Sequence, residues 1–295
     1  MATTGLPQTS ADLPRVTESL TMISPRWSVW VLMTLSAQPL RYTQIKTKLP
    51  WLADGQLHPR LRKLTDAGLV ERTQYASRHV TYGLTERGAD LMPVLTVIAA
   101  WGNTHLDKDI VLNQATGEHA PEHIAPAQNI EDTLALLTPR HATAILWTLQ
   151  ARGATSAKSL AAVALPDYGL SAIYPPLRQL TDDGLVESTG AEATFQLSAH
   201  GLALAPLYRS MSAWAAGRPL ADADHHPVWG QDPAPSRTEP GTWITNQSRL
   251  SAAPASTPAA PVLPAQPPVA KWKAGDLFSH RIPARTVAPA GGHGR

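Results

Sequence analysis

Residues 57–73 read LHPRLRKLTDAGLVERT, and residues 173–189 read IYPPLRQLTDDGLVEST. The two stretches align without a gap, and eleven positions carry the same residue in both. Self-similarity of this kind marks an internal repeat. The sequence therefore predicts two copies of one domain, copy 1 over residues 19–106 and copy 2 over residues 130–217.

The first two helices of copy 1 are predicted from the spacing of apolar residues. A stripe within residues 27–35 has the period of an amphipathic helix. A short second helix carries Ile45 and Leu49, and Pro50 closes it.

The third helix lies inside the repeated stretch. Leu57, Leu61 and Leu64 are spaced at i, i+4 and i+7, which predicts one buried stripe. We expect the helix to end at Gly68, because glycine adopts the left-handed backbone of a helix end at the least cost. We also expect Pro59 in the first turn, where the missing N–H of proline has no partner to lose.

Two strands and a last helix complete copy 1. Residues 69–75 and 79–84 alternate in polarity and are rich in β-branched side chains, which predicts a hairpin. A final helix, capped by Thr85, runs to Trp101. This order predicts a winged helix-turn-helix domain, with the hairpin as the wing and the third helix as the one that enters the major groove. The predicted fold class is mainly α with small β-wings, in two tandem winged helix-turn-helix domains.

Further motifs accompany the repeated stretch, namely Pro39-Leu40-Arg41-Tyr42, Leu49-Pro50, the run 82–88, and 91–95 with Trp101-Gly102. Together they resemble the HxlR-type winged helix regulators, bacterial transcription factors related to the MarR group. The resemblance covers nearly all of copy 1 and, more loosely, copy 2. It implies a DNA-binding regulator that is not an enzyme. It also implies pairing through the first and last helices, since members are typically homodimers.

The chain departs from that family in two ways. Some members sense through a cysteine, whereas this sequence has none, which also excludes disulfides and thiolate zinc sites. Members usually carry one such domain per chain, and here it occurs twice.

Charge differs sharply between the copies, although the whole chain carries a formal net charge of only +2. Residues 20–106 hold ten Lys and Arg against five Asp and Glu, and residues 130–217 hold five against seven. Lys and Arg supply the affinity of a protein for the phosphates of DNA. We therefore expect copy 1, and not copy 2, to bind double-stranded DNA.

The predicted DNA-binding residues lie on the second and third helices and the wing of copy 1: Arg41, Lys46, Gln56, His58, Arg60, Arg62, Lys63, Arg72, Arg78 and His79. Gln56, His58 and Arg60 fall near the start of the third helix, where contacts to base edges concentrate. Arg62 recurs as Arg178 in the acidic copy, so a structural role is its alternative. For Arg60 and Lys63 the alternative is an ordinary solvated helix face.

Three further segments flank the copies. Residues 1–18 are predicted to be a flexible N-terminus and residues 107–129 a linker. Residues 218–295 are predicted to be a disordered tail rich in Pro and Ala, because their composition cannot bury enough apolar surface to offset chain entropy. Within that tail, the basic and aromatic stretch 271–287 is either a docking motif for a protein partner or simply tail.

No secretory signal and no membrane-spanning run is expected, so the predicted location is cytoplasmic and associated with the nucleoid. His119 and His123 lie around Pro121 without further ligands, so no metal is predicted, and no cofactor motif or catalytic motif is found.

Two functions remain in competition. The first is a transcriptional regulator in which copy 1 reads DNA and copy 2 serves dimerisation, ligand sensing or partner binding. The alternative is a protein-interaction scaffold that uses both domains as docking modules. For the first function, an intramolecular pseudo-dimer and a homodimer through copy 1 are both open.

Overall fold

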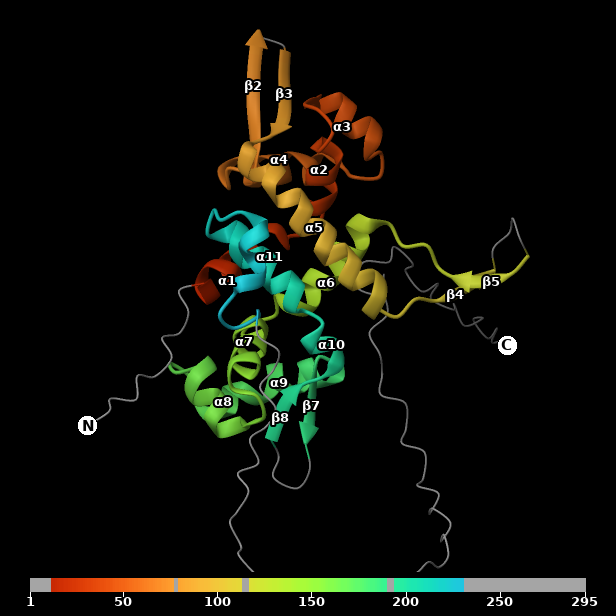
Figure 1. The fold of residues 1–295 in the computed structure, drawn as a ribbon. Helices are drawn as coiled ribbons and strands as arrows, with labels where there is room; N and C mark the ends of the chain where they lie inside the picture. The colour runs from red at the N-terminus through yellow and green to blue at the C-terminus, as the bar shows by residue number, and fades with distance from the viewer. Residues whose placement is uncertain (1–11, 77–78, 113–116, 190–193, 231–295) are drawn as a thin grey trace, which may run out of the picture.

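The same succession of helices and strands occurs twice along the chain (Figure 1). A computed structural model describes residues 12–76, 79–112, 117–189 and 194–230. The first succession is called the N-terminal half, residues 12–106. Its elements are α1 (Asp12–Ile23), α2 (Ser28–Leu35), β1 (Leu40–Arg41), α3 (Tyr42–Lys48), α4 (Asp54–Asp66), β2 (Val70–Ala76), β3 (His79–Leu84) and α5 (Glu86–His105).

The second succession, called the C-terminal half, covers residues 126–230. Its elements are α6 (Pro126–Leu137), α7 (Ala142–Arg152), β6 (Thr155–Ser156), α8 (Ala157–Ala164), the 3-10 helix η1 (Leu170–Ile173), α9 (Tyr174–Asp182), β7 (Val186–Thr189), β8 (Thr194–Leu197), α10 (Ala199–Leu202), α11 (Ala205–Ala215) and the 3-10 helix η2 (Leu220–His225). Between the halves lies the antiparallel hairpin of β4 (Ile110–Leu112) and β5 (His119–Pro121).

The two three-stranded sheets share one topology. Their strand orders are β1-β3-β2 and β6-β8-β7, all antiparallel. Strands β2 and β3 agree with the hairpin that alternation predicted, and they form the long wing of the N-terminal half. No helix in the described parts of the chain has both the length and the apolar character that a bilayer crossing requires.

Helix α4 is anchored by the predicted stripe. Leu57, Leu61 and Leu64 are all buried, and Gly68 follows the helix with a φ of 69°, as predicted. The expectation for Pro59 was wrong, because α4 begins at Asp54 and Pro59 falls in its second turn. Residues 54–58 extend the helix N-terminally although they include Gly55, and Pro59 then costs one intrahelical hydrogen bond.

In each half, one close backbone approach fixes the wing against the helix that follows it. A Cβ on Gly88 would lie 2.1 Å from the carbonyl oxygen of Leu69, and a Cβ on Gly201 would lie 2.2 Å from that of Leu185. No larger side chain fits at either position without moving the backbone. Both glycines also donate their N–H to the side-chain hydroxyl of the N-cap residue, Gly88 to Thr85 and Gly201 to Ser198.

The prediction of a flexible N-terminus over residues 1–18 was wrong for residues 12–18. They belong to α1, in which Val16, Leu20 and Ile23 are completely or almost completely buried. These residues share one helix face, and that face packs against α11 and α7 of the C-terminal half. Residues 1–11 lie outside the described part of the chain.

The two halves contact each other through their first and last helices. Helix α6 packs against α5 and α2, while α1 packs against α11 and α7, and α11 packs against α5. Each half thus receives the first helix of the other. In Figure 1 these helices fill the middle of the molecule, with the β2–β3 wing at one end and the β7–β8 wing at the other.

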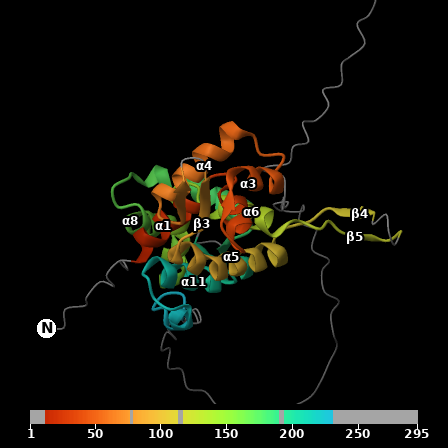
Figure 2. The ribbon, with the colours of Figure 1, turned by 90° about the horizontal axis from the view of Figure 1, so that it is seen from above.

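The linker predicted for residues 107–129 differs from the structure inside the segment and at its C-terminal end. Strands β4 and β5 pair within it, and its last four residues are already helical in α6. Figure 2 shows this hairpin projecting away from the helices.

The predicted disordered tail, residues 218–295, was wrong for its first thirteen residues. They contain η2 and Trp229, which is buried and contacts the rings of Tyr208 and Trp147. The prediction of disorder used the average composition of residues 218–295, which gives no weight to a single buried aromatic residue such as Trp229. Residues 231–295, including the stretch 271–287, lie outside the described part of the chain.

Candidate nucleic-acid interface

Helix α4 presents a polar, mainly basic face to solvent. Because Leu57, Leu61 and Leu64 hold the opposite face in the core, the side chains of Gln56, His58, Arg62 and Lys63 are exposed. This part of the predicted set therefore lies together on one helix.

The start of α4 is tied to α3 by an aromatic side chain. The ring of Tyr42 stacks on that of His58 at a centroid distance of 4.2 Å, and its hydroxyl donates to Asp54 Oδ1 at 2.8 Å. Burial and the bond to Asp54 raise the pKa of Tyr42 to about 12, and the same bond is the main cause that lowers the pKa of Asp54. His58 is thus held in one orientation before any ligand arrives.

Lys46 and Arg41 differ in their availability. Lys46 Nζ donates to the carbonyl oxygen of Leu52 and lies 3.5 Å from Asp54 Oδ1, so it closes the turn between α3 and α4. Arg41 is exposed immediately before α3, and its backbone N–H donates to Gln44 Oε1 at 2.8 Å. The predicted contact from Lys46 to DNA would have to replace its interactions with Leu52 and Asp54.

The wing brings one more predicted residue next to α4. Arg72 of β2 is exposed and lines a surface hollow together with His58, Arg62 and Tyr82. His79 opens β3, where its backbone pairs with Ala76. Arg78 lies outside the described residues. The hollow places basic groups of helix and wing side by side.

Arg60 lies at the edge of this face, one helical turn after Gln56. It is partly buried, and its Nε and Nη1 atoms are inaccessible to solvent and have no hydrogen-bond partner. Burial lowers the pKa of Arg60, and the charge of Glu131 on α6 opposes that shift. This predicted base-reading residue is therefore less accessible than its neighbours on α4, and it interacts electrostatically with a carboxyl group of the other half.

Glu131 itself is 2% exposed and was not among the predicted residues. Its Oε1 accepts a hydrogen bond from the N–H of Trp27 at 2.7 Å, while Oε2 is buried without a partner. Burial raises the pKa of Glu131 to about 7, although Trp27, Arg26 and Arg60 all favour the charged form. Nothing in the local sequence signals this contact, because its partners are far away along the chain.

The corresponding face of the C-terminal half has other chemistry. Position 174 is a tyrosine that is 52% exposed, and Gln179 donates to Asp183 at 2.9 Å. Burial raises the pKa of Asp183 to about 6. One feature is shared: Arg178 pairs with Asp182 at 3.8 Å, as Arg62 pairs with Asp66 at 3.9 Å, and all four side chains are largely exposed.

Comparison with known proteins connects this geometry to a family. Residues 22–110 match the model of the HxlR-like helix-turn-helix family. A protein of Methanothermobacter thermautotrophicus described as an HTH-type transcriptional regulator is 32% identical over 101 residues, which are 34% of this chain and 74% of that protein. The chain belongs to the HxlR-like helix-turn-helix family. A second relative, the HTH-type transcriptional regulator YkvN of Bacillus subtilis, is 31% identical over 36% of this chain and 87% of its own length.

Solved structures similar to this HxlR-like chain include the reduced form of the transcriptional regulator YodB from Bacillus subtilis. That structure is 27% identical, covers 31% of this chain and 91% of its own, and gives a TM-score of 0.30. The family match thus concerns about a third of the chain, from the end of α1 to β4.

Proposed function

We propose that the chain is a transcriptional regulator whose N-terminal half reads double-stranded DNA. In this proposal α4 enters the major groove, and the β2–β3 wing contacts the phosphate backbone. The observation that carries it is the exposed face of Gln56, His58, Arg62 and Lys63 beside Arg72. The relatives' descriptions as HTH-type transcriptional regulators support the same assignment.

The residues of this face divide by role. Gln56 and His58 are near the start of α4 and can donate to base edges, and Tyr42 holds His58 in place. Arg41, Arg62, Lys63 and Arg72 supply positive charge for phosphates. Arg78 and His79 stay predicted backbone contacts of the wing. Arg60 and Lys46 we assign to positioning, because Arg60 is partly buried and Lys46 donates to the α3–α4 turn.

The C-terminal half is proposed to be a diverged winged helix domain that pairs with the first. Supporting this, its element order and sheet topology repeat those of the N-terminal half. The pairing uses the first and last helices of each half, which are the helices that the family resemblance implies for dimers. The chain would then act as an internal pair with one basic and one acidic head, rather than as a homodimer through copy 1.

The test uses a matched pair of substitutions. Arg62→Ala and Arg178→Ala each remove an exposed arginine that pairs with an aspartate four residues later. On a duplex carrying the binding site, Arg62→Ala should weaken binding and reduce the slope of log affinity against log salt by about one, as expected for one lost phosphate contact. Arg178→Ala should leave both unchanged.

The measurement is a fluorescence-anisotropy titration at several salt concentrations with the full chain. Equal effects of the two substitutions, or no affinity of the wild type for any duplex, would overturn the assignment. If the wild type binds no duplex but the Arg62→Ala chain still binds a protein partner, the scaffold alternative is favoured.

A further inference from the structure

The start of α9 presents an apolar surface where the start of α4 presents a polar one. Tyr168, Leu170 and Tyr174, together called the apolar face, are 46%, 45% and 52% exposed. Among the described residues of the C-terminal half, the other large apolar side chains are at least partly buried. In the gapless alignment of the repeats, continued upstream, Asp54 and His58 stand at the positions of Leu170 and Tyr174. The apolar face is therefore a feature of one half and not of the repeated fold.

One ring of the apolar face is held in place although it is exposed. The hydroxyl of Tyr168 accepts a hydrogen bond from Arg140 Nη2 at 2.9 Å, and its ring meets that of His141 edge-on at a centroid distance of 4.9 Å. A side chain that is fixed before binding loses less conformational freedom when a partner covers it. Exposed apolar patches on soluble proteins mark interaction sites. This surface is therefore suited to a partner with apolar side chains.

The charge around the apolar face is negative. Residues 166–189 hold four Asp and Glu against one Arg, whereas the corresponding residues 50–73 hold three Asp and Glu against four Lys and Arg. The one arginine, Arg178, is paired with Asp182 at 3.8 Å. Complementary charge favours the encounter of two surfaces and their specificity. The partner of the apolar face should therefore be basic as well as apolar.

The chain itself contains a segment with this chemistry. Residues 271–287, called the basic segment, hold four Lys and Arg against one Asp. Its largest apolar side chains are Trp272, Leu277, Phe278 and Ile282. In both charge and apolar content the basic segment thus complements the apolar face.

The described chain ends close to the helices that carry the apolar face. Trp229 contacts the ring of Trp147 on α7, and α7 packs against α8 and α9. Forty residues lie between Gly230 and the basic segment, and a chain of that length spans at most about 140 Å. The segment can therefore reach α9, and the covalent connection raises its effective concentration there.

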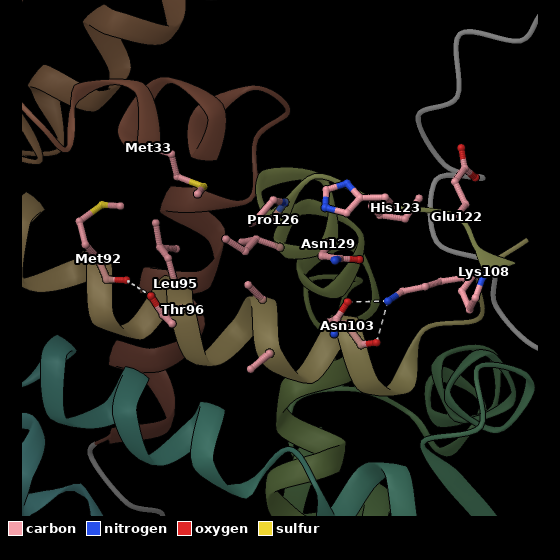
Figure 3. Close-up of a pocket in the computed structure, with 15 residues that line it drawn as sticks. Met33, Met92, Leu95, Thr96, Asn103, Lys108, Glu122, His123, Pro126 and Asn129 are labelled. Atoms are coloured by element: carbon pink, nitrogen blue, oxygen red, sulfur yellow. Dashed lines mark hydrogen bonds between the residues drawn. The ribbon is translucent and has the colours of Figure 1, made fainter. Parts of the chain in front are cut away.

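Two other surfaces are less suitable for a basic segment. The proposed DNA-reading face of α4 is itself basic. The cavity of about 660 Å³ between α2, α5 and α6 is largely apolar, but the charged side chains that line it are Lys108 and Glu122, which balance each other (Figure 3). Neither surface combines apolar side chains with an excess of negative charge.

We propose that the basic segment docks on the apolar face of the same chain. Its apolar side chains would cover Tyr168, Leu170 and Tyr174, and its Lys and Arg would lie near the acidic side chains of residues 166–189. The C-terminal half would then hold a segment of its own chain at the surface that corresponds to the proposed DNA-reading face. This inference goes beyond the proposed function, and its test uses no DNA, so the two can fail separately.

The test uses the full chain, which has no cysteine. Ser171→Cys with Ser279→Cys places one thiol between Leu170 and Tyr174 and the other in the basic segment. The matched control combines Ser279→Cys with Gly55→Cys, because residue 55 aligns with residue 171, is exposed and has open space around an added Cβ.

The measurement is the rate of intramolecular disulfide formation in a glutathione redox buffer, followed by non-reducing gels and by mass spectrometry of tryptic peptides. Docking raises the local concentration of one thiol near the other, so the Ser171→Cys pair should form its disulfide at least about tenfold faster than the Gly55→Cys pair. Salt should slow the faster reaction, because it screens the attraction between the basic segment and the acidic residues.

A third substitution tests the contact itself. In the chain with Ser171→Cys and Ser279→Cys, Tyr174→Ala should slow disulfide formation by roughly fivefold or more, as expected for the loss of one aromatic contact. Tyr75→Ala, which removes an exposed aromatic side chain of the β2–β3 wing, should leave the rate unchanged. Circular dichroism confirms that each variant is folded.

Equal rates for the two cysteine pairs, no disulfide in either, or no effect of Tyr174→Ala would overturn the proposal. Faster reaction of the Gly55→Cys pair would overturn it as well, by placing the basic segment on the N-terminal half. Disulfides formed only between chains would show that the apolar face takes a second copy instead.

Discussion

The buried carboxyl group of Glu131 should make the stability of the chain depend on pH. The group joins α6 to the N-terminal half through its bond with Trp27, and burial raises its pKa from 4.5 to about 7. Folding thus favours the protonated form. The stabilising contribution is fully present below pH 4.5 and is lost as the pH rises through 7.

The magnitude follows from the size of the shift. At about 1.4 kcal/mol per pKa unit, the stability contributed by the group falls by roughly 2–3 kcal/mol between pH 5 and pH 9. A glutamine can still accept the hydrogen bond from Trp27, but it does not titrate. The free energy of unfolding of Glu131→Gln, relative to wild type, should therefore rise by that amount over the same range.

Urea unfolding followed by circular dichroism at each pH measures this difference. Burial lowers the pKa values of His105, His141 and His226, which makes the chain more stable as the pH rises through their range. Because wild type and variant share these histidines, their effect cancels in the comparison. Glu18→Gln, on the exposed face of α1, serves as the control and should follow wild type. Parallel profiles of wild type and Glu131→Gln would refute the reasoning.

Three other predictions address the contacts between and beyond the halves. A chain ending at Gly217 loses the buried Trp229 and should be about 3–5 kcal/mol less stable than one ending at Gly230, by urea unfolding; equal stability would contradict an anchoring role. Gly102→Ala should lower the free energy of unfolding by about 1–3 kcal/mol, because its Cβ would lie 2.5 Å from Thr133 Oγ1 and 2.8 Å from the backbone oxygen of Asn129. Thr104→Ala should have little effect on the same free energy. In sedimentation, with and without DNA, the chain should be a monomer that protects an asymmetric site; a stable dimer on a palindrome would exclude the internal pair.

Periodicity and helix-end chemistry predicted α2 to α5 and the wing of the N-terminal half, but not α1 or β1. The stripe of Leu57, Leu61 and Leu64, the end at Gly68 and the cap at Thr85 are all local features, and the structure has each of them. The exposed side chains of α4 follow directly, because fixing the buried face of a helix fixes the opposite one.

The remaining features depend on contacts between residues distant in sequence. Arg60 has a suitable position for reading bases, but it is partly buried and interacts electrostatically with Glu131 of α6. Trp229 lies in a segment whose average composition indicates disorder, yet one aromatic ring finds a place against Tyr208. Neither contact has a sequence pattern of its own, so pairing between the halves had to be known first.

The exchange of first helices between the halves makes their covalent connection part of the architecture. If the gene were divided between the halves, each product would expose the apolar surface that the other's α1 or α6 now covers. Two separately inherited regulators could not easily arise again from such a chain. If the chain is the internal pair that we propose, each half also keeps the same companion, whereas the subunits of an ordinary dimer can exchange partners. The second half is therefore inherited together with the first. Its outer surface can diverge without producing mismatched pairs with halves of other chains.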